Sequence, residues 1–171
     1  MINLQDYIRD IQDFPKPGVL FKDITPLLAN KHASEACINN LEALVNGEKI
    51  DKVVAIESRG FFFGMLLAQR LDAGFVPIRK SGKLPYNTVV EPYSLEYGMD
   101  VIEMHEDAIK KGERVLLHDD VLATGGTAKA ACKLIEKLGG VVVQCNFIIE
   151  LQFLRGADKL KRYDVRPLIS Y

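Results

Sequence analysis

The residues with the clearest chemical potential lie in VLLHDDVLATGGT, residues 115–127. An apolar run ends there in two adjacent carboxylates, Asp119 and Asp120, and a turn of small residues follows. Glycine permits close backbone approach, threonine hydroxyls donate hydrogen bonds, and the free N–H groups at the start of a helix attract phosphate. The turn therefore predicts a phosphate-binding loop made of Ala123, Thr124, Gly125, Gly126 and Thr127.

The two carboxylates would repel that phosphate, but they accept hydrogen bonds from vicinal hydroxyls and stabilise a nearby positive charge. A ribose 5-phosphate meets both conditions. The patterns GxxxxGK[ST] and GxGxxG do not occur at this turn, so it is neither a Walker loop nor a dinucleotide fingerprint. The alternative is a plain strand-to-helix turn capped by Thr127. Two acidic residues at the end of a strand are costly without a ligand, which favours the binding hypothesis.

The elements that must position these residues follow from hydrophobic patterning. Short apolar runs rich in β-branched residues predict buried strands at 52–57, 75–79, 114–119 and 141–150. Helices are expected at 33–45, 60–72 and 127–138. Such alternation predicts an α/β fold with a mostly parallel sheet flanked by helices, in which ligands collect at the carboxyl ends of the strands.

Two segments depart from this alternation. The first 30 residues place Leu4, Ile8 and Ile11 at helical spacing before a turn-rich FPKPG, and they are interpreted as a small N-terminal hood. Residues 80–104 form a polar insert, and an irregular stretch of this length predicts a mobile, functional loop. Since no linker or repeat is visible, residues 1–171 are expected to form a single domain.

The composition excludes several classes of protein. The chain has 171 residues, 48% hydrophobic and 26% charged, as is typical of one globular domain. A formal net charge of -1 provides no driving force for binding nucleic acid or an anionic membrane. No apolar stretch approaches the roughly 20 residues of a membrane span, and the N-terminal segment lacks a signal-peptide pattern. Three cysteines without metal-ligand spacing indicate reduced thiols and a cytoplasmic location.

With these motifs together, the sequence resembles the type I phosphoribosyltransferases, whose signature is an apolar strand, two acidic residues and a Thr/Gly-rich phosphate loop. Four further segments narrow the resemblance to the adenine-specific members: FPKPGVLFKDITPLL, ESRGFFFG, RKSGKLP and YSLEYG. The resemblance implies the fold of that family, with a hood and a long flexible loop, often as a homodimer. It also implies the reaction of adenine with phosphoribosyl pyrophosphate to give AMP and pyrophosphate. Mg²⁺ would assist, bound mainly through the substrate's pyrophosphate and water.

The same resemblance implies roles for the charged residues. Asp119 and Asp120 would face the ribose while the loop holds the 5-phosphate. ESRG would be the pyrophosphate loop, with a cis bond between Glu57 and Ser58 and with Arg59 in contact with pyrophosphate. Three more cations would bind pyrophosphate, some of them in the neighbouring subunit's site: Arg79, Lys80 and Lys83. The alternative interpretations are that Arg59 is only a surface cation at the start of a helix and that RKSGK is only solvated surface.

The remaining implied roles concern the base. Glu96, on the mobile catalytic loop, would manage a proton on the purine, and Tyr97 would cover the site. Adenine would be held by Val19, Leu20, Phe21 and Lys22, partly through main-chain groups that read its polar edge. The alternatives are that Glu96 is a solvated loop carboxylate and Phe21 ordinary core. His118 is expected in a second core layer, because strand alternation directs it away from Asp119.

Two alternative functions stay open. One is a phosphoribosyltransferase for another purine base, hypoxanthine or guanine. The other is a regulator that senses phosphoribosyl pyrophosphate without turnover, which likeness of fold alone does not exclude. No helix-turn-helix pattern or basic domain precedes the core, and the segment carrying Glu96 is present. These two features favour an enzyme.

Overall fold

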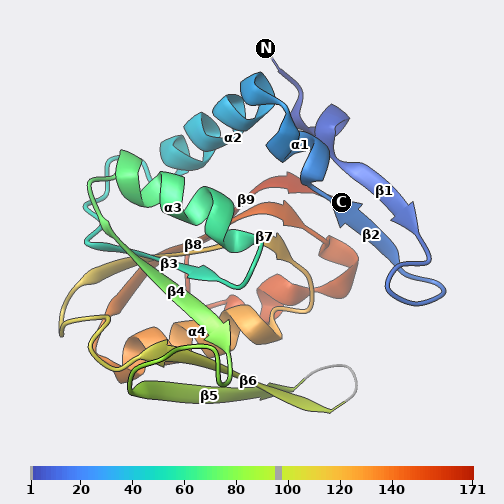
Figure 1. The fold of residues 1–171 in the computed structure, drawn as a ribbon. Coiled ribbons are helices and arrows are strands. Elements are labelled where there is room, and N and C mark those ends of the chain that lie inside the picture. Colours follow the sequence, from blue (N-terminus) through green and yellow to red (C-terminus); the bar gives the residue numbers. More distant parts are fainter. Residues whose placement is uncertain (1, 95–97) are drawn as a thin grey trace. The chain divides into compact units, whose positions relative to one another are not determined.

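A computed structural model describes residues 2–94 and 98–171 (Figure 1). The chain divides into two compact units, Met1–Asn40 and Leu41–Tyr171. The expected hood of residues 1–30 falls within the first unit, and every strand predicted from the sequence falls within the second.

The first unit is a short antiparallel ribbon with small helices. Its elements are η1 (Leu4–Tyr7), β1 (Arg9–Gln12), β2 (Leu20–Asp23), α1 (Thr25–Ala29) and the first part of α2 (Lys31–Leu44). The helical spacing at the N-terminus was misleading, because only η1 is helical there and Ile11 lies in β1 opposite Phe21 of β2. Pairing with β2 supplies the backbone hydrogen bonds of β1, so a tertiary partner overrides the local pattern.

The second unit is built on a seven-stranded sheet in the order β5-β6-β4-β3-β7-β8-β9. Its elements are β3 (Lys52–Ile56), α3 (Gly60–Arg70), β4 (Gly74–Lys80), β5 (Thr88–Ser94), β6 (Met99–His105), β7 (Arg114–Leu122), α4 (Gly126–Lys137), β8 (Val141–Glu150), η2 (Gln152–Leu154), η3 (Gly156–Leu160) and β9 (Val165–Ser170). Strands β4, β3, β7, β8 and β9 are parallel, which confirms the predicted architecture. Their carboxyl ends therefore meet at one edge of the sheet.

The polar insert at 80–104 is more regular than expected. Strands β5 and β6 pair antiparallel from Thr88–His105 to Ser94–Met99, and β6 continues onto β4 through Arg79–Glu103. The prediction of an irregular segment is therefore wrong for most of it. The strand pattern was hidden because buried positions carry acids, such as Glu91 on β5, whose charge is compensated by lysines of α4. Mobility of the loop stays a prediction, since residues 95–97 lie outside the described residues.

Helices α3 and α4 cover opposite faces of the sheet (Figure 1). The core between α4 and the sheet includes fully buried Leu117, Ile135 and Phe147. All three cysteines are free and buried. Within the described ranges, no helix combines the length and the apolar character that crossing a membrane requires.

Candidate functional site

The predicted phosphate loop joins β7 to α4 and is held by backbone-to-backbone packing. Gly125, in the left-handed region with φ 73°, caps the N-terminus of α4. A Cβ atom on Gly125 would lie 2.3 Å from the carbonyl oxygen of Gly156. A Cβ on Gly156 would lie 2.2 Å from the carbonyl oxygen of Ala123. Both positions therefore require glycine, and Gly156 is a residue that the sequence analysis missed, because this contact exists only in the folded chain.

The loop encloses a small cavity of about 80 Å³, lined by Asp119 and loop residues 121–128. No side chain caps α4, so the N–H groups of its first turn are available to a ligand. Oriented N–H groups and the positive end of the helix dipole attract phosphate. The structure thus places Ala123, Thr124, Gly125, Gly126 and Thr127 around an anion-sized hollow.

The two carboxylates lie at the carboxyl end of β7, and they differ in environment. Asp119 accepts a hydrogen bond from the backbone N–H of Asp120 at 2.9 Å. Burial, and then the neighbouring Asp120 charge, raise the pKa of Asp119 well above its ordinary value. Asp120 is 4% exposed and accepts a hydrogen bond from Nε of Arg59 at 2.5 Å. The strand runs on to Leu122 beyond the predicted end at 119, because β8 continues to pair with it.

Glu57 is the centre of a second cluster at the end of β3. The peptide bond between Glu57 and Ser58 is cis, as the resemblance implied. The Glu57 carboxylate accepts hydrogen bonds from Arg79 Nε at 3.3 Å, from the Lys80 backbone N–H at 3.0 Å and from Lys83 Nζ. Burial acts to raise the pKa of Glu57, but these hydrogen bonds outweigh it and lower the pKa to about 2. Glu57 thus holds two of the predicted pyrophosphate ligands in place.

A third group of contacts joins the phosphate loop to Lys80. The Tyr93 hydroxyl on β5 donates to Asp100 Oδ2 on β6 at 3.1 Å, and the same oxygen lies 3.2 Å from Lys80 Nζ. Burial raises the pKa of the Tyr93 phenol against the opposing effect of a hydrogen bond with Thr127. The sequence analysis missed Tyr93 and Asp100, which become partners only through the pairing of β5 with β6.

A buried carboxylate also fixes the turn after β4. Glu103 is 4% exposed and accepts the backbone N–H groups of Lys83 at 3.0 Å and Leu84 at 2.9 Å. It therefore sets the position from which Lys83 reaches Glu57. Nothing in the local sequence distinguished Glu103 from a solvated strand residue.

Other predicted residues belong to the first unit or lie outside the described residues. Residues 19–22 belong to the first unit, where β2 carries Leu20, Phe21 and Lys22. Phe21 makes an edge-to-face contact with Phe14 at 5.0 Å, and Lys22 binds Asp10 at 2.7 Å. The predictions for Glu96 and Tyr97 lie outside the described residues.

His118 is fully buried in β7, as expected of a core position. Its Nδ1 lies 2.8 Å from Asn146 Oδ1 on β8. Burial lowers the pKa of His118 to about 4, so the imidazole is neutral near neutral pH. A neutral histidine bonded to an amide supports packing between β7 and β8 rather than proton transfer.

This edge of the sheet combines a phosphate loop, two aspartates and a cluster of cations, which is typical of the phosphoribosyltransferases. The family model of the phosphoribosyl transferase domain matches residues 23–166. The adenine phosphoribosyltransferase of Flavobacterium johnsoniae is 62% identical over 99% of this chain and 100% of its own length. The chain belongs to the adenine phosphoribosyltransferase family.

Solved structures agree with this assignment. The adenine phosphoribosyltransferase of Rhodothermus marinus is 53% identical and superposes with a TM-score of 0.95, covering 98% of this chain and 96% of its own. The enzyme from Saccharomyces cerevisiae was solved with adenine and an imino-altritol bisphosphate. It is 41% identical, with a TM-score of 0.89 over 95% of this chain and 94% of its own.

Proposed function

We propose that this protein transfers the 5-phosphoribosyl group from phosphoribosyl pyrophosphate to adenine, giving AMP and pyrophosphate in purine salvage. The observation that carries the proposal is the cavity lined by Asp119 and residues 121–128. It places hydrogen-bond donors for a phosphate and a carboxylate close enough together to contact the same ligand. The 5-phosphate occupies the loop, and the ribose lies toward Asp119 and Asp120. The carboxylates stabilise the oxocarbenium-like charge that grows on the sugar as pyrophosphate leaves.

The cations are proposed to exchange partners when the substrate binds. Arg59 is held by Asp120 and Lys80 by Asp100, while Arg79 and Lys83 share Glu57. Pyrophosphate carries more charge than any one of these carboxylates and competes for the same N–H donors. Transfer of Arg59 to pyrophosphate releases Asp120, whose oxygens then accept the ribose hydroxyls. Substrate binding thus prepares the carboxylate for its role.

Magnesium fits the donor chemistry of this site, because a carboxylate pair beside substrate phosphates is a common setting for the ion. When bound, it offsets the charge of the leaving pyrophosphate. We propose that it is held mainly by pyrophosphate oxygens and water, with Asp119 and Asp120 nearby.

For the base, we propose the segment 19–22 and the loop residues Glu96 and Tyr97. Backbone groups of residues 19–22 recognise the amino edge of adenine, and Glu96 handles the proton on the purine. Closure of the loop excludes water that would otherwise attack the sugar cation. We further propose a cytoplasmic homodimer, as the family resemblance implies.

The test is a chromatographic assay of nucleotide formation from phosphoribosyl pyrophosphate with adenine, hypoxanthine, guanine or uracil, each with and without Mg²⁺. We expect AMP from adenine, strongly dependent on Mg²⁺. Turnover of hypoxanthine or guanine with adenine inert would reject the base assignment. Binding of phosphoribosyl pyrophosphate without turnover of any base would support the regulator instead.

The role of Glu96 has its own test. The substitution Glu96→Ala should lower kcat more than it weakens substrate binding. Glu106→Ala, which removes an exposed carboxylate bonded to Asn87, is the matched control and should leave kcat unchanged. An unchanged kcat in Glu96→Ala would refute the assigned role.

A further inference from the structure

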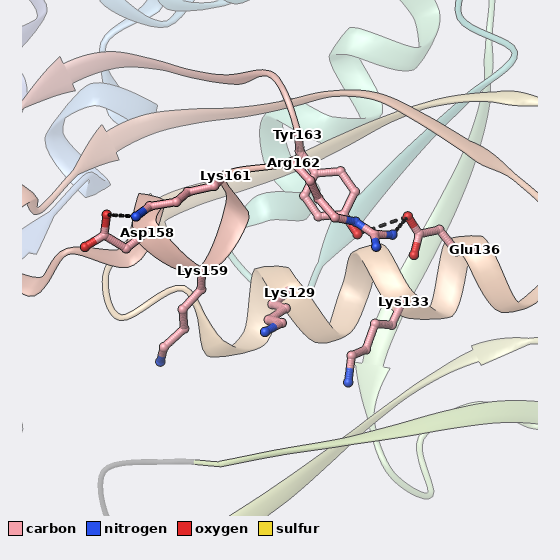
Figure 2. A pocket seen from close by; sticks show the side chains of 8 residues that line it. All are labelled: Lys129, Lys133, Glu136, Asp158, Lys159, Lys161, Arg162 and Tyr163. Carbon is pink, nitrogen blue, oxygen red and sulfur yellow. Dashed lines mark hydrogen bonds and ion pairs between the residues drawn. The ribbon is translucent and has the colours of Figure 1, made fainter.

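A second cavity, lined by none of the predicted site residues, lies between α4 and the segment around η3. It measures about 310 Å³, within the range of small-ligand pockets. Five cations line it: Lys129, Lys133, Lys159, Lys161 and Arg162. We name it the basic pocket. Figure 2 shows its side chains, which come from α4, from η3 and from the turn after η3.

The basic pocket concentrates positive charge in a chain that has almost none overall. Its lining includes only two carboxylates, Glu136 and Asp158, so it carries three net positive charges against -1 for the whole chain. Those two carboxylates are engaged with Arg162 and Lys161 (Figure 2). The cations that remain, Lys129, Lys133 and Lys159, are exposed and accessible to an anionic ligand.

The other three lysines point together to one side of α4, as Figure 2 shows. Lys133 binds Glu91 of β5 at 2.8 Å. In the described part of the chain, no carboxylate lies within 4 Å of the ammonium groups of Lys129 and Lys159. Lysines 129, 133 and 137 are spaced four residues apart, an arrangement of like charges that destabilises a helix. Glu91 offsets this repulsion at Lys133 and Lys137, whereas no carboxylate of the described residues does so at Lys129.

The basic pocket is continuous with the phosphate loop. An adjoining cavity of about 240 Å³ shares Lys129, Lys133 and Lys159 with it and extends to Gly126 of the loop. The same cavity reaches Tyr93, which contacts Thr127 and Asp100. An anion held by the three lysines would thus lie close to Gly126, at the start of α4.

We propose that the basic pocket is an outer anion site, which captures a multiply charged pyrophosphate group, free or esterified, on its way to or from the active site. The proposal rests on the proposed function, since phosphoribosyl pyrophosphate entering and pyrophosphate leaving share the required chemistry. A cluster of like charge beside a cleft raises the local concentration of a counter-ion and speeds its capture. Because these lysines are exposed, their attraction is screened by salt, with a Debye length of about 10 Å at 0.1 M.

The test is the double variant Lys129→Gln with Lys159→Gln, assayed at ionic strengths of about 0.02 M and about 0.5 M. At low salt we expect kcat/KM for phosphoribosyl pyrophosphate to fall about five- to tenfold, and at high salt less than about twofold. The value of kcat should not change. The matched control is Lys110→Gln with Lys111→Gln, which removes the same charge at the opposite edge of the sheet, before β7 begins. It should stay within about twofold of the unaltered protein at both ionic strengths.

Product inhibition shows whether the pocket binds the substrate, phosphoribosyl pyrophosphate, or the product, pyrophosphate. If the pocket captures the substrate, the KM for phosphoribosyl pyrophosphate rises in the double variant while the inhibition constant of pyrophosphate stays constant. If it also binds the leaving product, the inhibition constant of pyrophosphate rises as well. Equal behaviour of the double variant and its control at low salt would overturn the proposal, as would a loss that salt does not diminish.

Failure of the proposed function would be recognised separately, by the absence of turnover in the unaltered protein. In that event, titration calorimetry with pyrophosphate alone still tests the pocket. We expect about fivefold weaker binding by the double variant than by the control at low salt. Equal binding by the two variants would reject the outer site.

Discussion

The packing of Gly156 against the phosphate loop leads to the sharpest prediction. In Gly156→Ala the new methyl group would lie 2.2 Å from the Ala123 carbonyl oxygen, whereas ordinary contacts begin at 3.4 Å. Because the contact is with backbone, no side chain can rotate away. The loop must retreat by about 1.2 Å, and a displacement near 1 Å at a positioning element costs about 100-fold in rate. We expect kcat/KM for phosphoribosyl pyrophosphate to fall by about that factor.

Steady-state rates and calorimetry with AMP measure the effect, and urea unfolding shows how far the fold is retained. Gly140→Ala is the matched control, because its methyl group would meet Ile135 and Ile109 at 2.8 and 2.9 Å, beyond the far end of α4. This control should lower the free energy of unfolding by about 1–3 kcal/mol without weakening the binding of AMP. AMP affinity in Gly156→Ala equal to that of Gly140→Ala would refute the argument that this contact positions the loop.

Three further predictions concern Asp120, Glu57 and Tyr93. Asp120→Asn removes the charge that holds Arg59 in place and faces the ribose. We expect kcat to fall about 100-fold while the urea midpoint stays near that of the unaltered protein, and activity within twofold would contradict the assigned role. Glu57→Gln should lower the free energy of unfolding at pH 7 by about 1–2 kcal/mol, after allowance for solvent around the cations. Since the pKa of Glu57 is depressed to about 2 in the folded state, its stabilisation is present above its ordinary value of 4.5 and is lost as pH falls toward 2. Urea unfolding of both proteins across that range should show the difference shrinking, and a constant difference would exclude the charge as its cause. Tyr93→Phe should raise the KM for phosphoribosyl pyrophosphate about fivefold, as loss of one hydrogen bond allows. If the phenol acts through Asp100, the effects of Tyr93→Phe and Asp100→Asn should be less than additive, and full additivity would disprove the connection.

Much of the fold could be predicted because it depends on local patterns. The runs at 52–57 and 141–150 are rich in apolar, β-branched residues, so burial on both faces of a parallel sheet was the simplest solution. The structure confirms both predictions, because the two runs form strands β3 and β8. The hairpin of β5 and β6 escaped prediction because Glu91 and Glu103 occupy buried strand positions. Their charges are acceptable only beside lysines and backbone N–H groups supplied by other elements.

The candidate site likewise contains residues that the sequence identifies and residues that only the folded chain brings together. Residues 115–127 are contiguous, and their types alone indicate an acidic pair beside a phosphate loop. The chemistry of glycine, threonine and aspartate can be recognised without knowledge of any distant partner. The roles of Gly156 and Tyr93 depend on contacts with Ala123 and Asp100 that no local pattern announces. The sequence by itself thus determined which segment would bind phosphate. Only the tertiary structure decided how rigidly that segment is held and which cations surround it, because those contacts join strands and loops that are far apart along the chain.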